Sequence, residues 1–195
     1  MSENDWDREV DVLVVGTGNG GLTAAVCNWE MGSKDVLIIE KQDKVGGTSA
    51  MSGGGIWIPN SHYAQEAGAE DSLDDARRYL MNTLFGEDVP EDMIDTYLEK
   101  SPEMLKFLHD RTDVRYESLA EYPDYYTNME GARAGHRSLE PSPIMASELG
   151  DNWKNMTWTH FMMRMFNRIH FTQVEAHLLM VQLPGWKKLL GRLMW

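Results

Sequence analysis

Apolar residues near the start of the chain form two short runs, and a helical pattern separates them. Residues 10–15 are apolar except for one aspartate, which is typical of a buried strand. Apolar residues recur at helical spacing from Leu22 to Trp29, and residues 35–40 form a second apolar run that ends in an acid. A strand, a helix and a strand within about thirty residues predict two parallel strands joined by a right-handed crossover.

The middle of the chain carries signals for helices. Ser72 is a suitable N-cap, and Asp75 is the acid of a capping box, so a helix is predicted from here to Gly86. Pro90 suits the first turn of a second helix. Ser101, which precedes a proline, is predicted to start a third.

Extended and irregular segments surround these helices. Residues 41–55 are rich in Gly, Ser and Thr and predict a loop, which ends in the short extended piece Ile56–Pro59. A short strand is predicted at Val114–Tyr116. Residues 121–150 are expected to be irregular because prolines and glycines interrupt them. A helical pattern returns at Trp158–Leu183, until a Pro-Gly pair breaks it.

A glycine-rich turn follows the first predicted strand directly. Gly16, Gly18 and Gly21 have the spacing G-x-G-x-x-G. The first glycine permits the sharp turn, the second lets a pyrophosphate approach the backbone, and the third lets the helix pack closely on the sheet. The N-terminus of that helix offers unpaired N–H groups and a partial positive charge to phosphates. A glycine turn that binds nothing is the alternative, but the order of elements favours a site for the ADP half of a dinucleotide.

Two further features narrow the ligand. Glu40 lies nineteen residues after Gly21, where its carboxylate is placed to accept hydrogen bonds from ribose hydroxyls and to repel a 2′-phosphate, which disfavours NADP. The first strand, helix and strand do not separate NAD from FAD, because both carry ADP. In residues 41–55, small side chains let the backbone press against a flat ring, and hydroxyls are available to phosphate, ribitol or the flavin edge. A flexible linker is the alternative for this segment.

These motifs resemble a known family. A strand that ends in Glu-Lys, then Gly-Gly-Thr-Ser and Ser-Gly-Gly-Gly, resembles the fumarate reductase/succinate dehydrogenase flavoprotein superfamily. Within it, Gly-Gly-Thr at 46–48, Ser-Gly-Gly-Gly at 52–55 and Trp-Ile-Pro at 57–59 are most similar to the 3-ketosteroid dehydrogenases. The similarity extends to Pro-Asp-Tyr-Tyr at 123–126 and covers about residues 8–145.

The resemblance implies FAD as the cofactor and assigns roles to individual residues. The candidate cofactor-binding residues are Gly16, Gly18, Asn19, Gly20, Gly21, Glu40, Lys41, Gly47, Thr48, Ser49, Ser52, Gly53 and Gly54. The implied catalytic residue is Tyr125, with Tyr126 as the near alternative, in a network that removes a substrate proton. A tyrosine packed on a loop is the structural alternative, since phenol is a weak acid and needs neighbouring donors to act as a base.

The resemblance also implies a fold class and a domain layout. The chain is expected to be α/β, with a Rossmann-like FAD-binding domain of parallel sheet and helices that a mostly helical insertion interrupts. Residues 1–60 would hold the FAD-binding unit and the flavin loop, 61–120 a helical segment, and 121–195 the start of a substrate or cap domain. The proton-abstracting tyrosine, the group that polarises the ketone and a second FAD-binding stretch are expected in a later part of a longer protein.

The expected function is FAD-dependent dehydrogenation of a carbon–carbon bond next to a ketone, in a 3-ketosteroid-like substrate, with hydride transfer to flavin N5 and an external electron acceptor. One alternative is a flavoprotein of the fumarate reductase type that acts on a small enoate or dicarboxylate. Another is a catalytically inactive, truncated flavin-binding fragment.

Charge divides the chain into an acidic body and a basic tail. The net charge is −13, although residues 151–195 carry six Lys or Arg against two Asp or Glu. An acidic body repels phosphates, so no nucleic-acid partner is expected. Three interpretations of the Met-rich and aromatic tail stay open. They are a lid over a sterol-sized pocket, a segment that makes peripheral contact with a membrane, and a part of the core whose partners lie elsewhere.

Cysteine and histidine add little chemistry. The only cysteine, Cys27, forms no internal disulfide and is consistent with a reducing cytoplasm, the expected location. His160, His170 and His177 lie in the tail without a carboxylate at the spacing of a metal triad, so no metal is expected.

Overall fold

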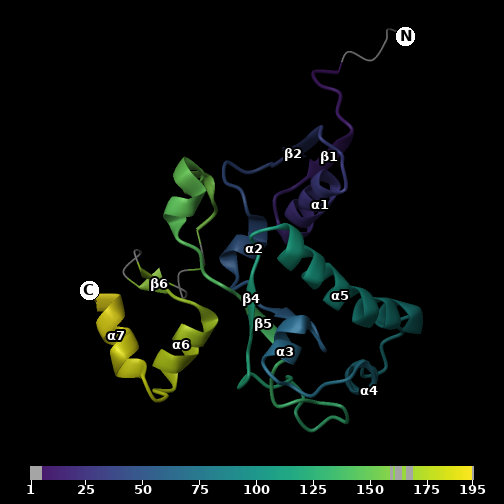
Figure 1. The fold of residues 1–195 in the computed structure, drawn as a ribbon, viewed down its shortest axis with the longest axis vertical. Helices are drawn as coiled ribbons and strands as arrows, with labels where there is room; N and C mark the ends of the chain where they lie inside the picture. Colours follow the sequence, from purple (N-terminus) through teal and green to yellow (C-terminus); the bar gives the residue numbers. More distant parts are fainter. Residues whose placement is uncertain (1–5, 159, 161–163, 166–168, 195) are drawn as a thin grey trace. The chain divides into compact units, whose positions relative to one another are not determined.

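The computed structural model describes residues 6–158, 160, 164–165 and 169–194. The chain folds into two compact units (Figure 1). Unit 1 consists of Met1–Gly53 and Ile144–Trp195, and unit 2 is the intervening Gly54–Pro143. The units cut across the three expected segments, and the functional boundaries proposed for those segments stay a prediction.

Unit 1 begins with the predicted strand, helix and strand. Strand β1 (Val12–Val15) pairs in parallel with β2 (Val36–Ile39), and helix α1 (Asn19–Glu30) connects them beside the sheet (Figure 1). Val14 and Ala25 are buried where helix and sheet meet. The predicted parallel pair and the α/β fold class are confirmed.

The neighbouring side chains of β1 are less well covered. Leu13 and Val15 remain 54% and 76% exposed, because strand side chains alternate between the two faces. Parallel sheets usually have both faces covered by helices. Within the described residues of unit 1, β1 therefore leaves apolar surface uncovered.

The second glycine segment contains a short helix and pairs with a distant part of the chain. Helix α2 (Gly47–Met51) lies inside the predicted loop. Just before it, Val45 forms a parallel bridge with Met156, which follows the 3-10 helix η1 (Ala146–Asn155). Residues 155–157 thereby lie beside the glycine-rich loop within unit 1.

The tail differs from the helical pattern predicted over Trp158–Leu183. Strands β6 (Arg164–Met165) and β7 (Ile169–His170) pair antiparallel, and helix α6 begins only at Gln173 and ends at Met180. Residues 159, 161–163 and 166–168 of that prediction lie outside the described residues. The prediction was wrong for both strands, because the apolar spacing there belongs to a hairpin.

A capping box sets the start of helix α6. The Thr172 hydroxyl accepts a hydrogen bond from the Glu175 amide, and the Glu175 carboxylate accepts one from the Thr172 amide, a capping box that starts α6. The predicted break after Leu183 is confirmed, and α7 (Trp186–Met194) follows it.

None of the helices in the described part of the chain is long and apolar enough to cross a bilayer.

Unit 2 is built around a small antiparallel sheet. Its strands are β3 (Ile56–Trp57), β5 (Ser138–Pro141) and β4 (Tyr116–Ser118), in that spatial order. β3 lies within the predicted extended piece at 56–59, and β4 overlaps the predicted strand at 114–116. β5 lies in the segment that was expected to be irregular, and the five-residue helix α3 (His62–Glu66) was not predicted.

Two long helices complete unit 2. Helix α4 (Leu73–Thr83) begins at the predicted N-cap, where the Ser72 hydroxyl accepts a hydrogen bond from the Asp75 amide. The Asp75 carboxylate does not complete the capping box, because Arg78 and Arg133 bind it instead. Pro90 is the N-cap of α5 rather than part of its first turn.

Helix α5 (Glu91–Arg111) is continuous through Pro102, so the third helix predicted to start at Ser101 does not exist separately. The helix continues because residues on both sides of the proline are buried on one face: Leu98 packs with Ala76, and Leu105 packs with residues of the sheet. This burial outweighs the single backbone hydrogen bond that a proline removes.

Candidate functional site

The predicted phosphate turn leaves bare backbone at the start of α1. Gly16 has a φ of +100°, a conformation that favours glycine, and a Cβ built on Gly16 or Gly20 would meet no heavy atom within 4 Å. A Cβ on Gly21 would lie 2.2 Å from the Gly16 carbonyl oxygen. The turn therefore combines close packing of helix on strand with an open backbone surface, as a pyrophosphate requires.

The Glu40 carboxylate is turned toward the glycine-rich turn, and the space beside the two is called the crevice below. Its Oε2 accepts hydrogen bonds from the amide of Thr17, at 3.0 Å, and from the Thr17 hydroxyl, while its Oε1 accepts one from the Gln42 amide at 3.0 Å. The Thr17 hydroxyl and these amides lower the pKa of Glu40 from 4.5 to about 2. The carboxylate is therefore ionised near neutral pH, and each oxygen retains acceptor capacity for a ribose hydroxyl.

Thr17 joins three parts of the crevice, and the sequence interpretation did not single it out. It is buried, donates to Glu40, and accepts a hydrogen bond from the Gly46 amide at 2.9 Å. One hydroxyl thus ties the phosphate turn to the end of β2 and to the second glycine segment. The only signal in the sequence was a hydroxyl residue at a variable position of the glycine motif.

The two glycine segments lie against each other. A Cβ on Gly47 would be 3.6 Å from the Gly18 Cα, and the Asn19 amide donates a hydrogen bond of 3.1 Å to the Ser49 hydroxyl. Residues that lie about thirty apart in the sequence therefore form one surface. The structure brings together the predicted residues Gly16 to Gly21, Glu40, Gly47 and Ser49.

Residues 154–157 form a further side of this surface that the sequence did not predict. The Val45 amide donates to the Asn155 carbonyl oxygen at 2.8 Å, and the Thr157 amide donates to the Val45 carbonyl oxygen at 2.8 Å. The Thr157 Cβ lies 3.9 Å from the position a Cβ would take on Gly46. No local motif signals such a pairing, because it joins segments more than a hundred residues apart.

The other predicted cofactor residues lie at the margins. Lys41 and Thr48 are exposed, and the Ser52 hydroxyl donates to the Ser49 carbonyl oxygen at 2.8 Å. Gly53 ends the first part of unit 1, whereas Gly54 belongs to unit 2, where a Cβ would lie 2.8 Å from the Pro141 Cγ. Contact of these residues with a flavin stays a prediction.

The candidate catalytic tyrosines lie on a loop of unit 2. Tyr125 is 82% exposed and Tyr126 is 45% exposed. The Tyr126 amide donates to the Tyr79 hydroxyl at 3.2 Å, and the Tyr126 ring lies edge-on to Phe85 with centroids 5.0 Å apart. The backbone of the loop is thus held while the Tyr125 ring projects from it.

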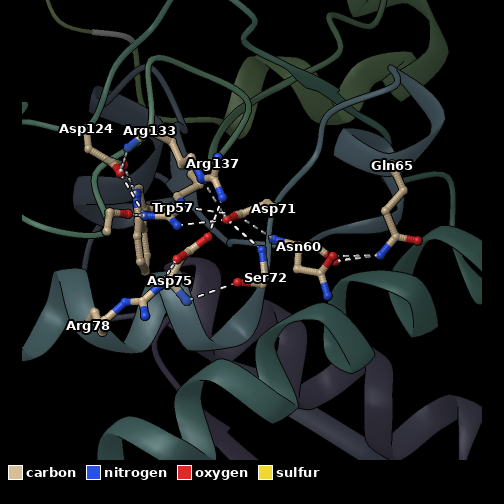
Figure 2. A network of polar contacts seen from close by, with 11 residues as sticks. Trp57, Asn60, Gln65, Asp71, Ser72, Asp75, Arg78, Asp124, Arg133 and Arg137 are labelled. Atoms are coloured by element: carbon tan, nitrogen blue, oxygen red, sulfur yellow. Dashed lines mark hydrogen bonds and ion pairs between the residues drawn. The ribbon is translucent and has the colours of Figure 1, made fainter.

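A buried ionic network holds the base of this loop, and it was not predicted. Figure 2 shows Arg137 between Asp71 and Asp124, with Trp57 and Arg133 beside them. Burial alone would lower the pKa of Arg137, but hydrogen bonds and charges from Asp71 and Asp124 hold it above its usual range. The guanidinium therefore stays charged. A buried arginine has no sequence signal of its own, although Asp71, Asp124 and the Gly-His-Arg segment that contains Arg137 are visible in the sequence.

A parallel strand pair, a glycine-rich turn with open backbone at Gly16 and Gly20, and an ionised acid after the second strand define a Rossmann-type domain for an ADP-containing dinucleotide. The chain belongs to the FAD-binding domain family, whose model matches residues 11–193.

Individual relatives share part of this chain's length. 3-Oxosteroid 1-dehydrogenase of Mycolicibacterium smegmatis is 40% identical over 149 residues, which are 76% of this chain and 26% of the relative. 4-Oxocyclohexanecarboxylate 2-dehydrogenase of Sinomonas cyclohexanicum is 39% identical over 142 residues, which are 72% of this chain and 24% of the relative. The chain thus spans about a quarter of the length of these curated relatives.

A solved structure is similar over almost the whole chain. The 3-ketosteroid Δ1-dehydrogenase of Sterolibacterium denitrificans, in complex with 1,4-androstadiene-3,17-dione, superposes with a TM-score of 0.86 at 37% identity. The match covers 94% of this chain and 32% of that chain. The expected resemblance to steroid dehydrogenases within the flavoprotein superfamily is confirmed.

The residues of unit 1 fit FAD as the cofactor. The open backbone at Gly16 and Gly20 leaves room for the diphosphate, and the ionised Glu40 is available to the adenosine ribose. Ser49 already occupies the Asn19 amide, so the remaining N–H groups at the start of α1 would serve the phosphates.

Proposed function

We propose that the protein of which this chain forms part is an FAD-dependent dehydrogenase that acts on a carbon–carbon bond next to a ketone, in a 3-ketosteroid-like substrate. The observation that carries this proposal is the similarity, over 94% of the chain, to a 3-ketosteroid Δ1-dehydrogenase. A relative named for a cyclic keto acid is 39% identical, which supports the same reaction type on a ring ketone.

Some residues of this chain would bind FAD, and others would take part in removing the substrate proton. The start of α1 would hold the diphosphate, and Glu40 would bind the ribose and fix the adenosine end. FAD, when bound, supplies the acceptor for the hydride that leaves the substrate. Tyr125, or its neighbour Tyr126, would contribute a hydroxyl to the network that takes the proton from the adjacent carbon.

An assay with two substrates tests the reaction. Protein loaded with FAD should bleach an artificial electron acceptor when it receives a Δ4-3-ketosteroid. It should not oxidise reduced viologen when it receives fumarate. The opposite pattern would support the fumarate reductase type instead. A Tyr125→Phe variant should lower kcat while flavin absorbance of the purified protein stays unchanged.

Flavin retention tests the remaining alternative, an inactive fragment. Purified protein should be yellow, and Glu40→Gln should weaken FAD binding because an amide is a poorer acceptor for ribose hydroxyls. Colourless protein that takes up neither FAD nor ADP would contradict the cofactor assignment for this chain.

We propose in addition that the tail makes peripheral contact with an anionic lipid surface. In α7, the exposed Lys187 and Lys188 lie away from the apolar face of Trp186, Leu190 and Leu193, which is half-buried and includes the buried Leu189. Met180, which ends α6, is 81% exposed. The exposed cations of Lys187 and Lys188 suit electrostatic contact with the surface of an anionic membrane, in which an apolar substrate would dissolve.

Vesicle binding tests this contact. A Lys187→Gln/Lys188→Gln variant should bind vesicles of anionic lipid about 30-fold more weakly, at about 1 kcal/mol for each cation lost. A Lys100→Gln/Lys106→Gln variant removes two exposed lysines of α5 and should bind like the unmodified protein. Equal binding of all three proteins, or binding that salt does not weaken, would contradict the proposal.

A further inference from the structure

Arg137 lies at the centre of the network in unit 2 and is 1% exposed. Its Nε and Nη2 donate to the two carboxylate oxygens of Asp71, at 2.9 and 2.7 Å. Its Nη1 donates to Asp124 Oδ2 at 2.9 Å and to the Gly131 carbonyl oxygen at 2.8 Å. The flat guanidinium thus donates to four oxygens of three residues, an arrangement that the compact ammonium group of a lysine does not reproduce.

Two of these acceptors, Asp124 and Gly131, lie near the two ends of the tyrosine loop, defined here as residues 122–133. Asp124 directly precedes Tyr125, and Gly131 lies near the far end of the loop. Within the loop, the Asp124 amide donates to the Arg133 carbonyl oxygen at 3.0 Å, and the Arg133 amide donates to Asp124 Oδ2 at 2.9 Å. One side chain therefore fixes the entry and the exit of the loop at once (Figure 2).

The surroundings of Arg137 keep this attachment rigid. The indole N–H of Trp57 donates to Asp124 Oδ1 at 2.7 Å, so both oxygens of that carboxylate are bonded. The guanidinium carbon lies 5.7 Å from the Trp57 ring centroid and 5.8 Å from that of Tyr79. Aromatic rings and buried carboxylates exclude water, and the resulting low dielectric strengthens each bond.

We propose that Arg137, with Asp71 and Asp124, is a positioning unit that sets the place of the Tyr125 and Tyr126 hydroxyls for the dehydrogenation. This inference rests on the proposed function. Tyr125 itself is exposed, so its location depends on the backbone that carries it. A displacement of about 1 Å in a reacting group can lower a rate by about 100-fold, so an anchor of this kind would act on kcat without touching the substrate.

A double-mutant cycle separates positioning from mere stability. Arg137→Lys keeps the charge but loses the planar guanidinium that binds several oxygens at once, and it should lower kcat about 10- to 100-fold with little change in KM. Tyr125→Phe or Tyr126→Phe should lower kcat as well. In the Phe background that lowers kcat, Arg137→Lys should change kcat by less than about twofold, because the hydroxyl it positions is gone. Effects that simply multiply would overturn the proposal.

Arg77→Lys is the matched control. Arg77 also binds two carboxylates, with 2.6 Å from its Nε to Asp95 and 2.6 Å from its Nη2 to Glu91, but these join α4 to α5 and do not involve the tyrosine loop. It should leave kcat within about twofold of the unmodified protein. If Arg137→Lys fails to fold, Asp124→Asn is the second variant, since it retains an acceptor for Trp57 and removes one for Arg137.

Amide hydrogen exchange gives a readout that does not depend on turnover. Exchange of the loop amides of Asp124, Tyr126 and Arg133 should become faster in Arg137→Lys and stay unchanged in Arg77→Lys. Unchanged loop exchange in Arg137→Lys would overturn the proposal. If the loop loosens but the protein oxidises no ketosteroid, the anchor stands as a structural device while the proposed function, and with it the role in positioning, fails.

Discussion

Gly21 is the residue at which the first helix touches the first strand. A methyl group at this position would lie 2.2 Å from the Gly16 carbonyl oxygen, which is backbone and has no rotamer to give way. Gly20, one residue earlier, has open space instead. The two neighbouring glycines therefore differ in role. Gly21 permits contact between the helix and the turn, whereas Gly20 leaves the backbone surface open to a ligand.

Substitution by alanine should separate these two purposes. Gly21→Ala should destabilise unit 1 by about 1–3 kcal/mol, as overpacking does. Gly20→Ala should be neutral or stabilising by up to about 1 kcal/mol, because alanine is the better helix former. Thermal or denaturant unfolding without FAD measures both. Equal destabilisation by both substitutions would contradict the geometry of the turn.

Glu40 should make unit 1 sensitive to acid in a defined window. Its pKa falls from 4.5 to about 2 on folding, so its contribution to stability is complete above pH 4.5 and is lost as the pH drops toward 2. Thr17→Val removes the largest cause of this shift and should move the carboxyl pKa back toward 4.5. NMR titration of the Glu40 carboxyl carbon measures the pKa. A pKa unaffected by Thr17→Val would show that the amides alone hold the carboxylate.

Sequence reasoning at the residue scale found the glycines and Glu40 because their spacing along the chain reflects one strand–helix–strand unit. It did not find Thr17, whose role depends on a bond to Gly46 in the next loop. It also did not find Arg137, because charge in a sequence does not reveal burial. Both omissions concern side chains whose partners are distant in sequence.

At the scale of elements, Pro102 misled the prediction. The proline suggested a helix start, but Leu98 and Leu105 are buried on either side of it and keep the two halves in line. In the tail, apolar spacing suggested a helix where two short strands pair. The helix at Gln173 had its own capping signal, Thr172 with Glu175, which periodicity alone overlooked.

Ser101 offers a test of the buried side of α5. Its hydroxyl is buried and, within the described residues, has no hydrogen-bond partner. Ser101→Ala should therefore stabilise unit 2 by about 1 kcal/mol, because it removes an unsatisfied polar group at little cost in packing. A shift of the urea midpoint measures this. Destabilisation would mean that the hydroxyl has a partner, such as a buried water.

At the scale of the whole molecule, the sequence predicted an α/β fold in which a mostly helical insertion interrupts a Rossmann-like FAD-binding domain, and the α/β class is confirmed. It did not predict that residues 144–157 return to the first unit. Their contact with Val45 is a backbone pairing, which any residue except proline can make, so no side-chain pattern announces it.

Thr157→Pro tests this return. Proline removes the N–H that binds the Val45 carbonyl oxygen, whereas Thr157→Ala retains it. The proline variant should destabilise unit 1 by about 1–3 kcal/mol relative to the alanine variant, and amide exchange at Gly46 and Gly47 should become faster. If the two variants unfold at the same denaturant concentration, the bridge contributes nothing to stability.

The bridge between Val45 and Met156 has a consequence for biosynthesis. A ribosome delivers the chain from its N-terminus, so the glycine-rich loop emerges about a hundred residues before the segment that pairs with it. At about 5–20 residues per second, this delay lasts about 5–20 seconds, during which unit 2 can fold while one side of the nascent nucleotide site is still missing.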